Sequence, residues 1–307
     1  MANILDIRRR IRSVTNTRQI TRAMKMVSAA RLRRAQERAL AARPYAQMLT
    51  NVLKSLVSRA DIFDPDTGEL LHPLLVRRPE QNVLLLIVTG DKGLAGAFNA
   101  NILKAAMRFI ESKSGKNIEL ETIGRKGRDF MRRRFKTAEP RKADSNASQA
   151  TTLVGEQVGV LNKIEYSLAS DVAERVISRY THAEIDSVYL VYNEFKSVIA
   201  QIPTAQQIIP PVFEQKSADA LGGAIYEFEP EAEDILNDLL PRNLAVQIFR
   251  ALLENAASFY GAQMSAMDNA TRNAGDMIRR QTLFYNRTRQ AMITKELIEI
   301  ISGAEAL

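Results

Sequence analysis

The sequence predicts an α/β protein with long helices at both ends. The N- and C-terminal helices are expected to pair as an antiparallel coiled coil, and a central domain to form a doubly wound, mostly parallel α/β sheet. Two observations support this fold class. Over residues 1–60 and 231–307, apolar residues recur at spacings of three and four, as in paired helices. Between them, in residues 61–230, the period shortens to about two and strand-like stretches alternate with helical ones.

The first long helix is expected from about Ala2 to Val57. Apolar residues mark its seam and are followed by small ones: Ile4, Ile7, Ile11, Val14, Ile20, Met24, Val27, Ala35, Ala39 and Ala42. No glycine or proline occurs before Pro44, which is expected to bend or locally interrupt the helix. The turn residues Asp64-Pro65-Asp66 then predict its end.

The second long helix is expected from Pro241, which suits a first helical turn, to Ser302. Its length predicts a rod of roughly 90 Å. The predicted seam is rich in alanine: Ala245, Ile248, Leu252, Ala256, Phe259, Ala262, Ala266, Ala270, Ala274 and Met277. Because alanine buries little area, this rod needs the other terminal helix and an enclosing partner.

In the central domain the strands are predicted from continuous or alternating apolar runs at Val83–Val88, Ile118–Ile123, Ser187–Tyr192 and Lys196–Ile202. Helices are predicted between them at Asn99–Ser112, Lys126–Phe135 and Ile164–Tyr180. The polar stretch Thr137–Thr152 is expected to be a loop.

Composition excludes several classes of site. The chain has no cysteine, so disulfides, thiolate metal sites and cysteine nucleophiles are excluded. Its two histidines, His72 and His182, lack a metal-ligand pattern and are expected at an exposed loop or helix end. No apolar run approaches the roughly 20 residues that span a bilayer. The first segment is neither a signal peptide nor a transit peptide by its pattern, because the seam starts at Ile4 and continues without a break.

The positive charge is concentrated at the N-terminus. The chain has a net charge of +8, whereas residues 1–43 alone hold twelve basic residues against Asp6 and Glu37. A partner of opposite sign is therefore expected along this segment.

Two motifs could carry chemistry. Gly90 to Gly96 follows a strand and precedes a helix, where phosphate-binding loops lie, but its spacing matches neither common phosphate-loop pattern. A structural turn is the alternative. The basic run around Arg125 to Arg134 could contact phosphate or form a solvated helix face. No set of residues forms a recognisable catalytic constellation.

The terminal segments resemble a known family. Residues 11–29 (IRSVTNTRQITRAMKMVSA) and 293–306 (ITKELIEIISGAEA) are similar to the N- and C-terminal signatures of the gamma subunit of F-type ATP synthases. The turn Asp91-Lys92-Gly93-Leu94-Ala95-Gly96 resembles the family's Asp-Lys-Gly-Leu-Cys-Gly motif, with alanine in place of cysteine, and residues 192–197 also fit. The similarity covers essentially the whole chain, in order.

The resemblance implies a central-stalk rotor without catalytic residues, metal or cofactor. In the family the paired helices run through the hexamer of alpha and beta subunits, and the α/β domain stands on the membrane c-ring beside the small epsilon subunit. Proton flow turns the rotor, which drives conformational change in the catalytic beta subunits. The resemblance places the complex on the cytoplasmic face of a bacterial inner membrane and implies neither a nucleic-acid partner nor a small-molecule substrate for this chain.

Six partner contacts follow from the same resemblance. Met24 and Lys25 would face acidic loops of beta, although Met24 also lies on the apolar face. Gln290 would meet the loops that grip the shaft higher up. Gln263 stands where the family often has arginine, next to Phe259-Tyr260 where a polar pair is usual. Phe195 and Lys196 would lie near the c-ring and epsilon.

Two other functions remain as alternatives. A basic coiled coil with a pI of about 9.7 could bind nucleic acid, although its basic stripe lacks base-reading or aromatic side chains. The turn at Gly90 could instead serve a nucleotide-dependent α/β enzyme.

Overall fold

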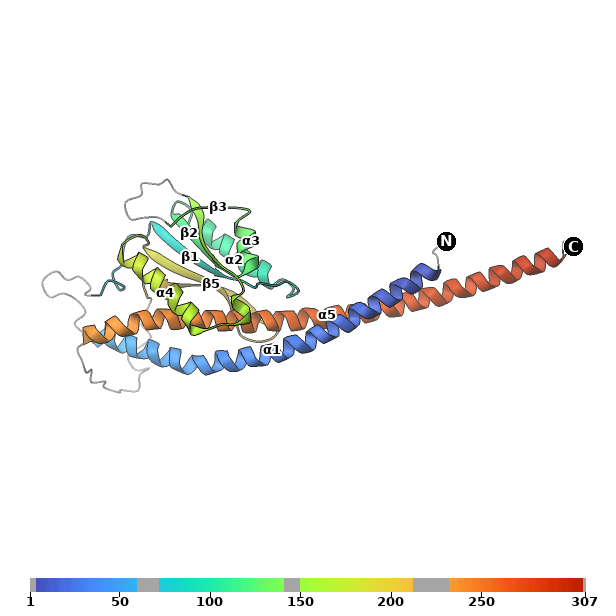
Figure 1. Cartoon of the computed structure of the whole chain (residues 1–307), viewed down its shortest axis with the longest axis horizontal. Helices are drawn as coiled ribbons and strands as arrows, with labels where there is room; N and C mark the ends of the chain where they lie inside the picture. Colours follow the sequence, from blue (N-terminus) through green and yellow to red (C-terminus); the bar gives the residue numbers. More distant parts are fainter. Residues whose placement is uncertain (1–3, 60–71, 141–149, 212–231, 306–307) are drawn as a thin grey trace. The chain divides into compact units, whose positions relative to one another are not determined.

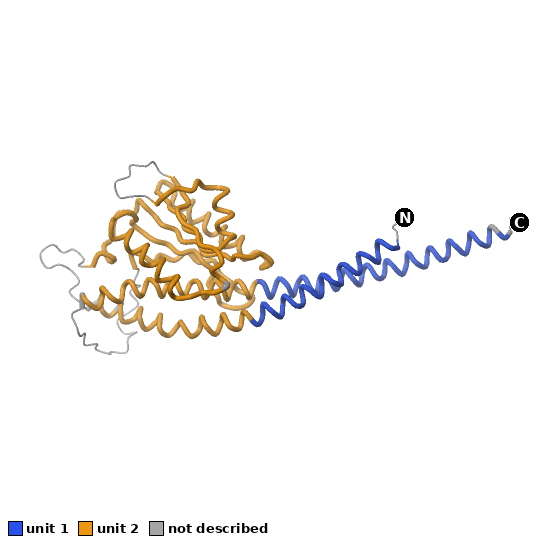
Figure 2. The backbone as a smooth tube through the Cα atoms, in the orientation of Figure 1, with its two compact units in different colours: residues 1–30, 263–307 blue, residues 31–262 orange. Residues whose placement is uncertain are grey.

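The computed structural model describes residues 4–59, 72–140, 150–211 and 232–305. Two long helices, α1 (Ile4–Arg59) and α5 (Ala232–Glu305), accompany an α/β domain (Figure 1). The chain divides into two compact units (Figure 2). One contains residues 1–30 and 263–307, and the other contains residues 31–262 with the whole sheet. The predicted fold class is confirmed.

The sheet has six strands in the order β3-β4-β2-β1-β5-β6. Their bounds are β1 (Asn82–Val88), β2 (Asn117–Ile123), β3 (Lys136–Thr137), β4 (Thr151–Gln157), β5 (Ser187–Phe195) and β6 (Gln201–Ile209). All neighbours run parallel except β5 and β6, which form an antiparallel hairpin at one edge. The sheet is therefore mostly parallel, as the sequence predicted.

Three helices accompany the strands: α2 (Phe98–Ser112), α3 (Arg125–Met131) and α4 (Tyr166–Thr181), with a short 3₁₀ turn at Val160–Asn162. From Val83 to Val88 every residue of β1 is at most 1% exposed, because a central parallel strand is covered on both faces. The buried stripes of α2 and α4 follow helical spacing and include Ile102, Ala106, Val172 and Val176.

Two predicted loop or strand assignments are wrong. The strand predicted at Lys196–Ile202 begins at Gln201, and residues 196–200 form the turn of the β5–β6 hairpin. The loop predicted at Thr137–Thr152 overlaps the first two residues of β4, and no strand was predicted there; only Leu153 of β4 is deeply buried. An edge-proximal strand of this kind lacks the apolar alternation on which the prediction depends.

Pro44 and Pro241 both lie inside long helices. α1 continues through Pro44, so the predicted local interruption does not occur, whereas the predicted bend stays a prediction. Pro44 is exposed, where water can satisfy the carbonyl that loses its partner. Pro241 is not in a first turn, because α5 already begins at Ala232. The turn predicted at Asp64-Pro65-Asp66 lies outside the described residues.

The two histidines differ. His182 is exposed at the C-terminal end of α4, as predicted. His72 is only 6% exposed, so its predicted exposure is wrong, and its Nδ1 accepts a hydrogen bond from the backbone N–H of Leu74 at 3.1 Å. Burial lowers the pKa of His72, against a smaller raising effect from the side chain of Asn237. His72 is therefore a neutral core residue.

An ionic cluster lies beside the first residues of β1. The carboxylate of Glu80 accepts hydrogen bonds from Lys113 at 2.7 Å, from Lys116, from Ser187 at 2.7 Å and from Tyr189 at 2.8 Å. Burial favours a higher pKa for Glu80, but these four hydrogen bonds together outweigh it and lower the pKa to about 2. The cluster ties the end of α2 to β5.

No helix among the described residues combines the length and apolar content that a membrane crossing requires. Nor do the described residues contain a group of three or more His, Asp or Glu side chains that could hold a metal ion.

Candidate functional site: the paired terminal helices

Three polar contacts join α1 to α5 in the unit formed by residues 1–30 and 263–307. The Thr271 hydroxyl donates to Thr21 Oγ1 at 2.8 Å. Lys25 Nζ pairs with Asp268 at 2.5 Å, and Ser28 Oγ donates to Gln263 Oε1 at 3.0 Å. As the α1 number rises, the α5 number falls. The two terminal helices therefore lie antiparallel, which confirms the predicted pairing.

The seam of α1 keeps a heptad period through these polar residues. Ile7, Val14, Thr21, Ser28 and Ala35 lie seven apart, and all are buried or half-buried. Ile20 and Val27, predicted on this seam, are 61% and 52% exposed, so that part of the prediction is wrong. The prediction assigned the seam to the apolar residues Ile20 and Val27. The buried positions are their neighbours Thr21 and Ser28, one residue further along the helix. A strict count of seven would have found the correct positions.

Two of the six predicted contact residues serve the helix pair itself. Gln263 is 8% exposed and is hydrogen-bonded to Ser28. The side chain of Lys25 is 43% exposed, and its nearest acidic partner is Asp268 of this chain. The hydrogen bond from Lys25, with a smaller contribution from Arg272, holds the pKa of Asp268 below its usual range against the opposing effect of desolvation. Sequence reasoning missed Asp268, although an acidic residue facing a basic heptad position was a detectable signal.

The other four predicted residues lie at or near the surface. Met24 is half-buried on α1, next to Lys25. Gln290 is exposed on α5. At the β5–β6 turn, Phe195 is half-buried and Lys196 is 55% exposed, with Glu194 at 3.9 Å. The structure does not bring these residues together at a single site.

The basic stripe of α1 is largely open to solvent. Ten of its twelve cations are exposed: Arg8, Arg9, Arg10, Arg12, Arg18, Arg22, Arg31, Arg33, Arg34 and Arg38. Lys25 and Arg43 are half-buried. The stripe therefore presents positive charge along one helix, as the sequence predicted.

The last turns of α5 expose a series of large apolar side chains. Residues 291–302 are all exposed, and Leu297, Ile298, Ile300 and Ile301 range from 54% to 69%. The register of the three polar contacts places Ile4, the first described residue of α1, opposite Thr288 or its neighbours. The described part of α1 therefore does not cover the residues of α5 that lie well beyond Thr288. Exposed isoleucine and leucine at this density are typical of a surface that contacts another molecule.

In the larger unit, a buried polar cluster connects α1, α5 and β5. The side chain of Glu254 is 1% exposed and pairs with Arg250 at 2.9 Å and with Arg43 at 3.9 Å. On the next turn, Ser258 Oγ donates to the carbonyl of Asn193 at 3.1 Å. Burial, followed by the charge of Glu254, raises the pKa of Tyr192 to about 12. The cluster fixes both helices to the sheet through directional contacts.

The turn at Gly90 is closed by its own side chains. Asp91 accepts backbone hydrogen bonds from Arg125 at 3.0 Å, Gly159 at 2.8 Å and Leu161 at 3.3 Å. These N–H groups follow β2 and β4 at the carboxyl edge of the sheet, where doubly wound folds bind anionic ligands. An atom added at the Cβ position of Gly90 would lie 2.9 Å from the ring of Phe259. These contacts favour the structural-turn interpretation over the nucleotide site.

Comparison with known proteins agrees with this geometry. The ATP synthase family model matches residues 3–307. The chain is 52% identical to the ATP synthase gamma chain of Rhodopseudomonas palustris strain BisB18 and 50% identical to that of Xanthobacter autotrophicus strain Py2, in both cases over the whole of each chain.

Solved structures give the same result at the level of the fold. A chain of the Tetrahymena thermophila mitochondrial ATP synthase central stalk and c-ring is 25% identical with a TM-score of 0.58, covering 82% of this chain and 99% of that one. A chain of the Euglena gracilis mitochondrial ATP synthase is 19% identical with a TM-score of 0.63, covering 99% and 94%. With paired terminal helices, a mostly parallel sheet and these relatives, the chain belongs to the gamma-chain family of F-type ATP synthases.

Proposed function

We propose that this chain is the central-stalk rotor of a proton-translocating F-type ATP synthase, coupling rotation of the membrane ring to conformational change in the catalytic beta subunits. The observation that carries the proposal is the antiparallel helix pair fixed by Thr21–Thr271, Lys25–Asp268 and Ser28–Gln263. Side-chain contacts between two helices resist sliding and let the pair turn as one body, which torque transmission requires.

The proposed partners are the alpha and beta subunits around the helix pair, the epsilon subunit and the c-ring. The exposed apolar end of α5 suits an enclosing apolar collar, and the basic stripe of α1 suits acidic loops. Met24, the exposed part of Lys25 and Gln290 are the proposed direct contacts with the hexamer. Gln263 acts through Ser28, because little of its own side chain is exposed.

At the other unit, the β5–β6 turn is the proposed contact with epsilon and the c-ring. Besides Phe195 and Lys196, it carries Ile199, which is 93% exposed. An isoleucine at a hairpin tip gains most of its transfer free energy only when a partner covers it, about 2 kcal/mol.

We infer that the chain is a non-catalytic subunit. Three backbone donors at the carboxyl edge of the sheet, those of Arg125, Gly159 and Leu161, are directed at Asp91 and so are occupied within the chain. ATP chemistry then belongs to the partner subunits. The proposed location is the cytoplasmic face of a bacterial inner membrane, as a peripheral part of the complex.

Co-purification with its partners tests the function. A tagged chain expressed with the alpha and beta subunits should recover a stoichiometric hexamer that hydrolyses ATP. Recovery of the tagged chain by itself would refute the proposal. A steep salt-dependent affinity for duplex DNA in place of the hexamer would favour the nucleic-acid alternative.

A disulfide bond between α1 and α5 tests whether the two helices turn together as one rigid body. Because the chain has no cysteine, Thr21→Cys with Thr271→Cys introduces a single possible disulfide within it, at a position where the two hydroxyl oxygens lie 2.8 Å apart. Rotation and ATP hydrolysis by the assembled complex should be equal in the oxidised and reduced forms. Arrest upon oxidation would mean that the two helices move against each other during turnover.

A further inference from the structure

A groove between α2 and α3 has no role in the function proposed above. Its volume is about 550 Å³, which is in the range of protein sites that hold a ligand. The basic run that the sequence analysis singled out around Arg125 to Arg134 supplies one side of it. All of it lies within the unit that contains the sheet.

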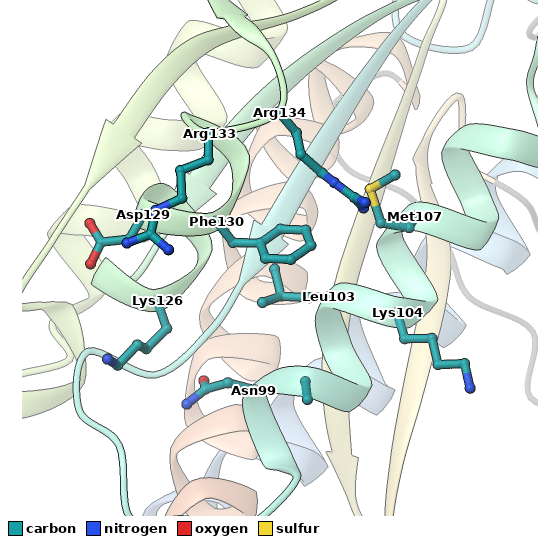
Figure 3. Close-up of a pocket in the computed structure, with 10 residues that line it drawn as sticks. Asn99, Leu103, Lys104, Met107, Lys126, Asp129, Phe130, Arg133 and Arg134 are labelled. Carbon is teal, nitrogen blue, oxygen red and sulfur yellow. The ribbon is translucent and has the colours of Figure 1, made fainter.

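The floor of the groove is apolar. Ala100, Leu103 and Met107 lie at spacings of three and four along α2 and form a stripe beside the face that packs into the core. Phe130 enters from α3, and Figure 3 shows it facing the same cavity as Leu103. Leu103 is 8% exposed, and Met107 and Phe130 are half-buried. An apolar side chain could therefore be received here.

The rim of the groove is positively charged. Four exposed cations line it, Lys104, Lys126, Arg133 and Arg134, and none of them forms an ion pair with any described residue. The guanidinium of Arg134 lies 5.3 Å from the ring centroid of Phe130. Asp129 is the one acidic residue among the described lining residues, and it already accepts hydrogen bonds from Arg128 at 2.9 and 3.0 Å. The groove therefore has an excess of unpaired positive charge.

The cations are distributed around the apolar floor. In Figure 3, Lys126 and Arg133 lie on the α3 side and Lys104 on the α2 side, with Leu103 and Phe130 between them. A single phosphate or sulfate would need convergent donors. Charges on both flanks of an apolar strip instead match a ligand that is elongated, apolar on one face and acidic along its edges.

We propose that this groove binds an acidic amphipathic helix of a partner protein. Its apolar side chains would enter between Leu103 and Phe130, and its carboxylates would pair with Lys104, Lys126 and Arg133. The proposal does not depend on the rotor function, because it rests only on the shape and charge of the central domain.

The test uses the full chain and a fluorescein-labelled synthetic helical peptide with leucines at spacings of three and four, flanked by glutamates. Two matched peptides serve as controls: in one the glutamates are replaced by glutamines, and in the other the leucines by serines. Fluorescence anisotropy gives the affinities. We expect binding of the first peptide, about tenfold weaker or undetectable binding of either control, and a loss of affinity between 50 and 500 mM salt.

Protein variants locate the binding site. Lys126→Glu with Arg133→Glu should weaken binding about tenfold, because two surface ion pairs of up to about fivefold each are lost and the new carboxylates repel those of the peptide. Lys136→Glu makes the same change of charge on exposed β3, outside the groove, and should alter affinity by about twofold or less. Phe130→Ala should weaken binding about tenfold. Circular dichroism checks that each variant keeps its fold.

Two results would overturn the proposal. One is equal binding by the groove variants and by Lys136→Glu. The other is equal binding of the serine-substituted peptide, with full displacement by inorganic tripolyphosphate, which would make the groove a general anion site.

Discussion

Neutralising Glu254 should destabilise the sheet-containing unit without altering any surface contact. Removing one partner of a buried ion pair costs about 3–5 kcal/mol when the other charge is left buried. Here Arg43 and Arg250 are 37% and 39% exposed, so water recovers part of the loss, whereas Glu254 itself is 1% exposed. We therefore expect Glu254→Gln to lower the free energy of unfolding by about 2–3 kcal/mol, which corresponds to a decrease in Tm of about 5–10 °C.

Thermal and urea unfolding followed by circular dichroism measure this change. Glu174→Gln is the matched control: Glu174 is exposed on α4, and its substitution should change stability by about 0.5 kcal/mol or less. A double-mutant cycle of Glu254→Gln with Arg250→Gln should give a coupling energy of about 1–2 kcal/mol. If the two changes add without coupling, or if Glu254→Gln matches the control, then the cluster does not fix α1 and α5 to the sheet as argued.

Three further predictions follow from contacts in the central domain. The pKa of Glu80 is about 2, against a usual 4.5. The ionised carboxylate therefore stabilises the fold fully above pH 4.5, and this stabilisation is lost as the pH falls toward 2. In Glu80→Gln, acid unfolding should lack this pH-dependent loss of stability, which is about 1–2 kcal/mol. Asp91→Ala should speed hydrogen exchange of the Arg125 amide and destabilise the unit by about 1–3 kcal/mol; unchanged exchange would contradict this assignment. Gly90→Ala should cost about 1–3 kcal/mol in urea unfolding, because its Cβ would meet the Phe259 ring, and wild-type stability would show that the ring can move away.

The strongest sequence signals correspond to dense apolar burial. The run at Val83–Val88 and the helix at Asn99–Ser112 were predicted to within a residue or two, because each buries a continuous face. Strand β4 lacks that signal, since its place in the sheet is set by pairing with β2 and β3, not by its own residues. Pairing between distant segments leaves little trace in a local pattern.

The candidate site was predicted at the level of helices but not of side chains. The antiparallel pairing followed from two long periodic segments. The partners of Lys25 and Ser28, which are Asp268 and Gln263, could not be predicted in this way. They lie more than 200 positions away in the sequence, and their contacts depend on the register of α5 against α1. The cluster around Glu254 had one local signal, a charged residue inside the apolar run of α5 with Arg250 one turn before it.

The carboxylate of Asp91 bears on whether the turn at Gly90 depends on a small-molecule ligand. Many folds of this architecture read the level of a cellular metabolite at the edge where their parallel strands end. Here a carboxylate of the chain itself occupies that position and accepts hydrogen bonds from the backbone N–H groups of Arg125, Gly159 and Leu161. The backbone at this turn is therefore held by the chain's own residues and needs no bound nucleotide to keep its shape.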